Sequence, residues 1–265
     1  MSQSINIQRL SELKRAGEKI VALTAYDASF ARVLAECGVE VILVGDSLGT
    51  VLHGERNTLR VGLDDMVYHT RIATRGAGGA FVLADMPFMS YATPERAFDG
   101  AARLIGEAGA HMVKLEGGGW LCATVEQLTT RGIPVCAHLG LTPQWVRKFG
   151  GHRAQGRDAQ AAEIMLRDAL ALEAAGAELL VLECVPAKLA ARISKAVRMP
   201  VIGIGAGADC DGQVLVLYDL IGVSDWSPKA ARNFLQGAGD IRAAVRAYVQ
   251  AVKSGAFPGP EHGID

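Results

Sequence analysis

Four apolar segments with the composition of β-strands each end in a carboxylate. The acids are Asp46, Asp85, Glu116 and Glu183, and the segments are VEVILVGD, GAFVLAD, AHMVKLE and AELLVLE. An acid at the end of an apolar strand is costly to place unless it is solvated, paired or bound to a metal. Four such acids can converge only if their strands lie parallel with the same ends together. This pattern predicts a metal-assisted active site at the C-terminal mouth of a β/α barrel.

Three of these acids, Asp46, Asp85 and Glu116, are the candidate metal ligands. Their hard oxygen atoms suit Mg²⁺ or Mn²⁺, and the sequence has no Cys/His cluster that would suit zinc. Because Mg²⁺ typically takes only one or two protein carboxylates besides water and substrate, we expect Glu116 to act through a water. Without a cation, three adjacent acids would repel one another and at least one would bind a proton.

The fourth acid, Glu183, is the candidate general base. Its neighbours in LLVLECVP are apolar, so desolvation is expected to raise its pKa towards the range that a base needs. An ion pair with an arginine or lysine near the barrel mouth is the alternative interpretation.

Lys114, Ser47 and His138 are three further candidates for contacts with the substrate. Lys114 is two residues before an acid on the same strand, so both side chains share one face. The nearby acids should keep this lysine protonated, which favours an ion pair or a substrate contact over a Schiff base. Ser47 lies in the turn GDSLG and His138 ends the segment VCAHLG; a turn serine and a core histidine are the alternatives.

Eight apolar segments are the predicted strands. They span residues 21–27, 39–46, 80–87, 111–117, 133–140, 178–184, 200–207 and, more weakly, 214–222. Continuous apolar runs of this kind are typical of parallel strands buried on both faces. Helical patterns lie between them, so we predict an α/β fold in which residues 1–265 form a single (β/α)8 barrel domain. A doubly wound sheet is the alternative, but no glycine-rich turn follows the first strand.

Helix start and stop signals support the same architecture. Thr93-Pro94 and Thr142-Pro143 have the form of an N-cap followed by a first-turn proline. The longest helix is predicted over 158–175. A short N-terminal helix and a C-terminal helix over 240–253 are also predicted. The polar stretch FGGHRAQGRD at 149–158 is predicted to be a flap.

Composition narrows the class of protein. The chain has a net charge of −1 and no run of basic residues, so we expect no nucleic-acid partner. No apolar run approaches the roughly 20 residues of a membrane span. We therefore expect no membrane partner. The five cysteines form no C-x-x-C pair and are odd in number, which favours reduced thiols in a cytoplasmic protein.

Several longer stretches resemble one enzyme family. They include TAYDASFA, LVGDSLG, LADMPFMSYATPE, MVKLEGG, PVCAHLGLTPQ, GGHRAQGR and LLVLECVP, in that order. The chain resembles the 3-methyl-2-oxobutanoate hydroxymethyltransferase (ketopantoate hydroxymethyltransferase) family from about residue 5 to about residue 262. The stretch SDWSPKAARNFL at 224–235 matches the family pattern less closely.

The resemblance implies a reaction and its cofactors. The enzyme would transfer a hydroxymethyl unit from 5,10-methylenetetrahydrofolate to 3-methyl-2-oxobutanoate through a Mg²⁺-stabilised enolate, giving 2-dehydropantoate for pantothenate synthesis. It implies a barrel of the phosphoenolpyruvate/pyruvate type, one Mg²⁺ per subunit and a cytoplasmic homodecamer. By resemblance the metal positions are Asp46, Asp85 and Glu116. The substrate contacts are Asp46, Ser47, Asp85 and Lys114, and the catalytic base is Glu183.

Two other functions compete with this one. The first is a Mg²⁺-dependent lyase or mutase of the phosphoenolpyruvate/pyruvate barrel group. Such lyases usually need a catalytic cysteine on a flexible loop, and the predicted flap at 149–158 has none. The second is a barrel that only binds a small acid or serves as a scaffold, which should not need Glu183 and Lys114 beside the metal acids.

Overall fold

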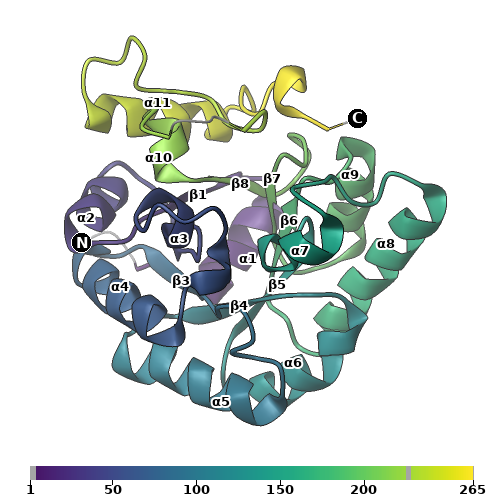
Figure 1. Cartoon of the computed structure of the whole chain (residues 1–265). Coiled ribbons are helices and arrows are strands. Elements are labelled where there is room, and N and C mark those ends of the chain that lie inside the picture. The colour runs from purple at the N-terminus through teal and green to yellow at the C-terminus, as the bar shows by residue number, and fades with distance from the viewer. Residues whose placement is uncertain (1–3, 225–227, 265) are drawn as a thin grey trace.

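The strands form a closed parallel barrel. The computed structural model describes residues 4–224 and 228–264. Its eight strands pair in sequence order, and the last pairs with the first (Figure 1). They are β1 (Ile20–Thr24), β2 (Val41–Val44), β3 (Phe81–Asp85), β4 (Met112–Glu116), β5 (Val135–Gly140), β6 (Leu179–Glu183), β7 (Val201–Ile204) and β8 (Gly212–Leu215). The predicted (β/α)8 barrel is confirmed, and the open sheet was the wrong alternative.

Side chains alternate between two hydrophobic layers along every strand, as the two-residue period of a strand requires. One set points into the barrel and packs with Leu10 and Leu13 of the first helix. The other set points outward and packs under the helices. On β3, β4 and β6 the inward set continues to the last residue, so Asp85, Glu116 and Glu183 point into the barrel mouth.

Helices cover the outside of the barrel (Figure 1). The α-helices are α1 (Ile7–Ala16), α2 (Ala28–Glu36), α3 (Leu48–Val51), α4 (Leu63–Gly76), α5 (Pro94–Ala102), α6 (Cys122–Thr129), α7 (Val146–Phe149), α8 (Ala159–Ala174), α9 (Ala187–Ala196), α10 (Leu217–Leu220) and α11 (Ile241–Lys253). A π-helical turn, η2 (Arg103–Glu107), continues α5, and 3₁₀ turns occur at η1 (Thr58–Arg60), η3 (Gly119–Leu121), η4 (Pro143–Trp145) and η5 (Pro260–His262).

The predicted cap residues begin the helices as expected. The side chains of Thr93, Asp158 and Asp240 each accept a hydrogen bond from a backbone N–H in the first turn of α5, α8 and α11. These caps satisfy donors that a helix start would otherwise leave without a partner. The Thr142-Pro143 signal instead begins a single 3₁₀ turn, η4, which is followed by the short helix α7.

Three sequence predictions need correction. The eighth strand was predicted at 214–222, but β8 ends at Leu215 and residues 217–220 form α10. Residues 205–211 connect β7 to β8 without a helix, so strands and helices do not alternate there. Asp46 lies two residues beyond the end of β2, in the turn before α3, so it follows its strand and does not end it. Residues 225–227 of the loosely matching stretch lie outside the described residues.

The first helix covers the end of the barrel opposite the mouth. Leu10 and Leu13 of α1 are buried against the inward side chains of the strands, and α1 is seen through the barrel in Figure 1. All five cysteines are free. Within residues 4–224 and 228–264, none of the helices is both long and apolar enough to cross a membrane.

Candidate active site

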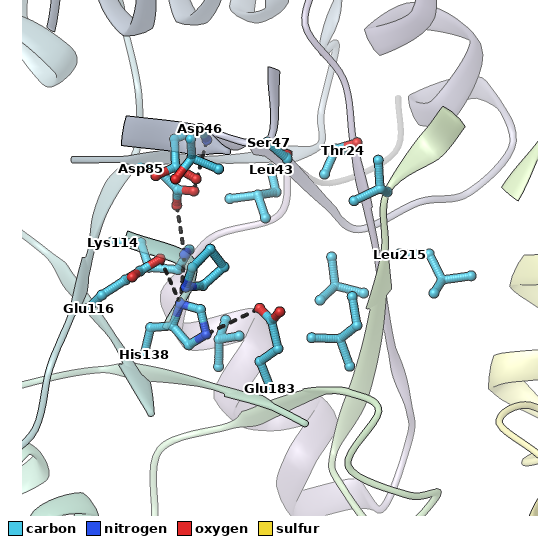
Figure 2. A pocket seen from close by; sticks show the side chains of 16 residues that line it. Thr24, Leu43, Asp46, Ser47, Asp85, Lys114, Glu116, His138, Glu183 and Leu215 are labelled. Carbon is cyan, nitrogen blue, oxygen red and sulfur yellow. Dashed lines mark hydrogen bonds and ion pairs between the residues drawn. The ribbon is translucent and has the colours of Figure 1, made fainter. Parts of the chain in front are cut away.

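Lys114 lies at the centre of a group of charged side chains in the barrel mouth (Figure 2). Its Nζ atom is 2.9 Å from Asp85 Oδ1 and 3.1 Å from His138 Nδ1, and the side chain is buried. Strand register produces this arrangement, because Asp85 is paired with Lys114 across β3 and β4, and Glu116 with His138 across β4 and β5.

The mouth holds more buried negative than positive charge. Asp46, Asp85 and Glu116 are all buried beside the single ammonium of Lys114. Burial, and then repulsion by Asp85, raises the pKa of Asp46 to about 7. Burial, and then Asp46, holds the pKa of Glu116 well above its usual range. Burial alone would lower the pKa of Lys114, but the three acids outweigh it and raise that pKa.

The protonation of His138 follows from its contact with Lys114. An ammonium can only donate, so the Lys114 Nζ donates to His138 Nδ1, and the neutral ring carries its proton on Nε2. Burial, and then the charge of Lys114, holds the pKa of His138 well below its usual range. The Nε2 atom lies 3.4 Å from Glu183 Oε2 and has no hydrogen bond of good geometry within the described residues. His138 therefore presents an N–H group to Glu183.

Glu183 has the environment expected of a general base. Its side chain is about one fifth exposed, at 20%, so it can reach a bound molecule. Burial raises its pKa to about 7, although the charges of Lys114 and His152 oppose that rise. The carboxyl group is thus poised between its acid and base forms near neutral pH.

All the predicted site residues line one cavity of about 110 Å³. They are Asp46, Ser47, Asp85, Lys114, Glu116, His138 and Glu183. Five apolar side chains also line it, those of Leu43, Val181, Ile204, Val214 and Leu215. Ser47 Oγ also shares a hydrogen bond of 2.9 Å with the hydroxyl of Tyr26. The cavity suits a small molecule with an anionic end and a branched apolar end.

The acids differ in how they are held. In Figure 2, Asp46 and Asp85 lie together, whereas Glu116 lies beside Lys114 and His138. Among residues 4–224 and 228–264, no three His, Cys, Asp or Glu side chains form a ready group of metal ligands. Asp46 and Asp85 are nevertheless linked, because the backbone N–H of Asp46 donates to Asp85 Oδ2 at 3.0 Å.

The sequence as a whole matches one family model. The ketopantoate hydroxymethyltransferase model matches residues 4–260. The chain belongs to the ketopantoate hydroxymethyltransferase family. It is 60% identical over 257 residues to 3-methyl-2-oxobutanoate hydroxymethyltransferase of Erwinia tasmaniensis, covering 97% of each chain. It is 58% identical to the enzyme of the same name from Nitrosococcus oceani, covering 96% of this chain and 97% of the relative.

Solved structures support the fold of this ketopantoate hydroxymethyltransferase family member. A phosphonopyruvate hydrolase in complex with oxalate and Mg²⁺ superposes with a TM-score of 0.63 at 12% identity, over 97% of this chain and 92% of that one. The 2,3-dimethylmalate lyase, a member of the PEP mutase/isocitrate lyase superfamily, superposes with a TM-score of 0.56 at 17% identity, over 96% and 89%. These likenesses show that the chain shares its barrel fold with both of these enzymes.

Gln144 is a residue of the candidate site that the sequence interpretation missed. Its buried side chain donates to Asp46 Oδ2 and to the Met86 carbonyl oxygen, both at 2.9 Å. Its backbone N–H donates to Glu116 Oε2 at 3.0 Å, and its Oε1 accepts from the Tyr91 hydroxyl. Gln144 thus connects two of the acids. Only its position in the loop that follows the fifth strand could have indicated it.

Proposed function

We propose that this protein transfers a hydroxymethyl unit from 5,10-methylenetetrahydrofolate to 3-methyl-2-oxobutanoate. With one water consumed, the products are 2-dehydropantoate and tetrahydrofolate. Membership of the family supports this activity. The main structural support is the cavity of about 110 Å³, which is lined by a buried lysine, three buried acids and Glu183 as the candidate base. The substrate has an anionic 2-oxo acid end and a small branched end, which suit the charged and the apolar side chains of this lining.

The donor set fits Mg²⁺. All three candidate ligands are carboxylates, and their charge exceeds that of Lys114, so a cation would offset their repulsion. We assign Asp46 and Asp85 as the residues that would hold one Mg²⁺ per subunit, with Glu116 acting through a water. When bound, Mg²⁺ supplies positive charge to the oxygen atoms of the 2-oxo acid.

Gln144 is expected to support this metal site, because it holds both Asp46 and Glu116. Gln144→Leu keeps the side chain's approximate size and the backbone contact to Glu116, but removes the donor to Asp46. Loss of a hydrogen-bond partner that orients a metal ligand typically lowers metal affinity by about 10–100-fold. Calorimetry should therefore show Mg²⁺ binding weakened by about that factor. The control is Gln250→Leu on the exposed side of α11; equal affinity in the two variants would contradict the role.

The side chains divide the chemistry between them. Glu183 removes the proton from C3 of the substrate, and the electron pair moves towards the keto oxygen. The ammonium of Lys114 stabilises the negative charge that develops there. His138 is a positioning residue, because its Nε2–H faces Glu183 Oε2 and limits the directions in which that carboxylate can point. C3 then forms a bond to the one-carbon unit, the bonds from that carbon to the two folate nitrogens break, and water supplies the oxygen of the new hydroxyl group.

We also propose that the chain works as a cytoplasmic homo-oligomer, a decamer, and that residues 1–265 form one domain. Large apolar side chains on the surface, among them Tyr68, Phe88 and Met89, support contacts between copies. Light scattering should give about ten times the 27.9 kDa mass of one chain. A mass equal to one chain would contradict the assembly without affecting the proposed reaction.

Proton NMR of 3-methyl-2-oxobutanoate in D₂O tests the reaction in two steps. With enzyme and Mg²⁺ alone, exchange at C3 should collapse the methyl doublet. Adding methylenetetrahydrofolate should then produce a hydroxymethyl signal. If folded, metal-loaded protein gives neither exchange nor product, the transferase proposal fails and a lyase or mutase of the same barrel group replaces it.

A further inference from the structure

A second cavity lies beside the barrel mouth. It has a volume of about 410 Å³ and is formed by the loops after β4 and β5, the flap at 149–158 and one side of α8. Its walls carry three aromatic rings: Trp120 and Trp145 have ring centroids 6.0 Å apart, and Phe149 is stacked on Trp145 at 6.3 Å. Such rings offer a flat apolar surface to a planar ligand.

The lining of the second cavity also contains one acidic side chain, Asp168, and one basic side chain, Lys148. The half-buried carboxylate of Asp168, on α8, makes no hydrogen bond or ion pair with any residue that the structure describes. It approaches the backbone so closely that a Cβ at Gly118 would overlap with it, and one at Gly119 would lie 3.1 Å from its Oδ1. Lys148 is exposed at the rim, with Nζ 4.7 Å from the centre of the Trp145 ring. An acid inside and a base at the rim suit a ligand with N–H donors at one end and an anion at the other.

Glycines on the loop after β4 create the room for this arrangement. Gly117 has φ +151°, and a Cβ there would lie only 2.7 Å from the Trp120 ring. Together with Gly118 and Gly119 it leaves a stretch of bare backbone between the Trp120 ring and the Asp168 carboxylate. A side chain at these positions would displace one of the two groups or fill the cavity.

The two cavities adjoin through shared segments of chain. Glu116 and Pro143 line the barrel cavity, whereas the next residue Gly117 and the preceding residue Thr142 line the second one. The flap residue Gln155 also lines the second cavity, and its backbone N–H donates at 3.1 Å to the carbonyl oxygen of the residue that follows the proposed base Glu183.

The volumes of the two cavities limit the size of the ligand that each can hold. Pockets for larger organic ligands usually measure about 300–1,000 Å³. The barrel cavity, at about 110 Å³, lies well below that range and has room only for a small acid, whereas the second cavity, at about 410 Å³, lies within it. A carrier with a fused ring system therefore cannot share the barrel cavity with the 2-oxo acid.

We infer that the second cavity binds the ring system of the one-carbon carrier, an inference that rests on the proposed function. The planar ring lies against Trp120 and Trp145, and its N–H edge donates to Asp168. The anionic tail of the carrier passes Lys148 at the rim. This position places the carrier against the loops after β4 and β5, where neighbouring residues line the barrel cavity that holds the 2-oxo acid.

The test compares Asp168→Asn with Glu163→Gln, an exposed acid on the same helix. A hydrogen bond to a charged acceptor is worth enough to change affinity by about ten-fold or more. Asp168→Asn should therefore raise the KM for methylenetetrahydrofolate, and the Kd for tetrahydrofolate measured by calorimetry, by about that factor. Glu163→Gln should leave both constants within two-fold of the parent values. Exchange at C3 of 3-methyl-2-oxobutanoate without folate should be unchanged in both variants.

The outcomes are distinguishable. If Asp168→Asn leaves the KM and the Kd unchanged, the carrier does not bind here and the inference is wrong, even if the parent enzyme performs both reactions. If that variant changes the mass of the assembly in light scattering but not these constants, the cavity is a contact between subunits. If the parent enzyme shows no exchange and no transfer, the proposed function itself fails. A second variant, Trp145→Leu, removes the aromatic wall and should weaken tetrahydrofolate binding in the same direction while exchange continues.

Discussion

Glu183→Gln is expected to slow the exchange of the C3 proton of 3-methyl-2-oxobutanoate by about 10²–10⁴-fold, the usual contribution of a positioned general base. Glutamine has the same shape but cannot accept the proton. It keeps an oxygen that can face the Nε2–H of His138, which lies 3.4 Å from the present carboxylate. Binding of the 2-oxo acid and Mg²⁺ should therefore change little. NMR exchange rates and calorimetric titration of the substrate measure the two quantities separately.

Glu178→Gln is a suitable control, because Glu178 lies at the start of the same segment, directly before β6 and far from its C-terminal end. Exchange in this control should match the parent. If Glu183→Gln exchanged the proton at the parental rate, another group would be the base. If it lost substrate binding as well as exchange, Glu183 would contribute to the binding site instead.

The pH dependence of the exchange gives an independent check on the base. Glu183 acts as a base only when it is ionised, and burial raises the pKa of its carboxyl group to about 7. The exchange rate should therefore increase as the pH rises through about 7 and level off above it. An ordinary glutamate, with a pKa of about 4.3, would give a flat profile in this range. The rising limb should be absent from the residual rate of Glu183→Gln.

The barrel and most of its site could be predicted from sequence because both depend on strand periodicity. Side chains two residues apart on a strand share a face, so an acid at the end of an inward-facing row must enter the mouth. This argument placed Lys114 and Glu116 together on β4 and brought Glu183 to the same cavity from β6. Their catalytic and binding roles stay predictions until the variants are measured.

Features that depend on contacts between distant segments could not be predicted. Gln144 is a buried amide that joins Asp46 to Glu116, and nothing in its local sequence specifies those partners. The orientation of His138 depends on Lys114 from the neighbouring strand, so the approach of its ring to Glu183 could not be predicted from its own segment. The end of β8 was placed too late because VLVLYDLIG is apolar throughout, and periodicity cannot separate a buried strand from a short buried helix.

Asp85→Asn is expected to weaken Mg²⁺ binding by more than about 100-fold, the upper end of what is lost when a residue that only orients a ligand is removed. Asp85 faces Lys114 at 2.9 Å and accepts the backbone N–H of Asp46, so it acts on the metal site and on the substrate's oxyanion site together. Asparagine keeps an acceptor for the Asp46 N–H. The 2-oxo acid should bind more weakly in parallel, and calorimetry with each ligand in the presence of the other measures both losses.

The fold should survive this substitution, which separates a functional loss from unfolding. Breaking a buried ion pair usually destabilises a protein because it leaves one charge without a partner. Here Asp46 and Glu116 still attract Lys114, and removing one of three mutually repelling carboxylates lowers the pKa of the other two. The thermal transition should therefore stay near that of Asp209→Asn, an exposed control. Unaltered Mg²⁺ dependence in a folded Asp85→Asn enzyme would remove Asp85 from the metal site, and Asp46 would then be the remaining direct ligand to test.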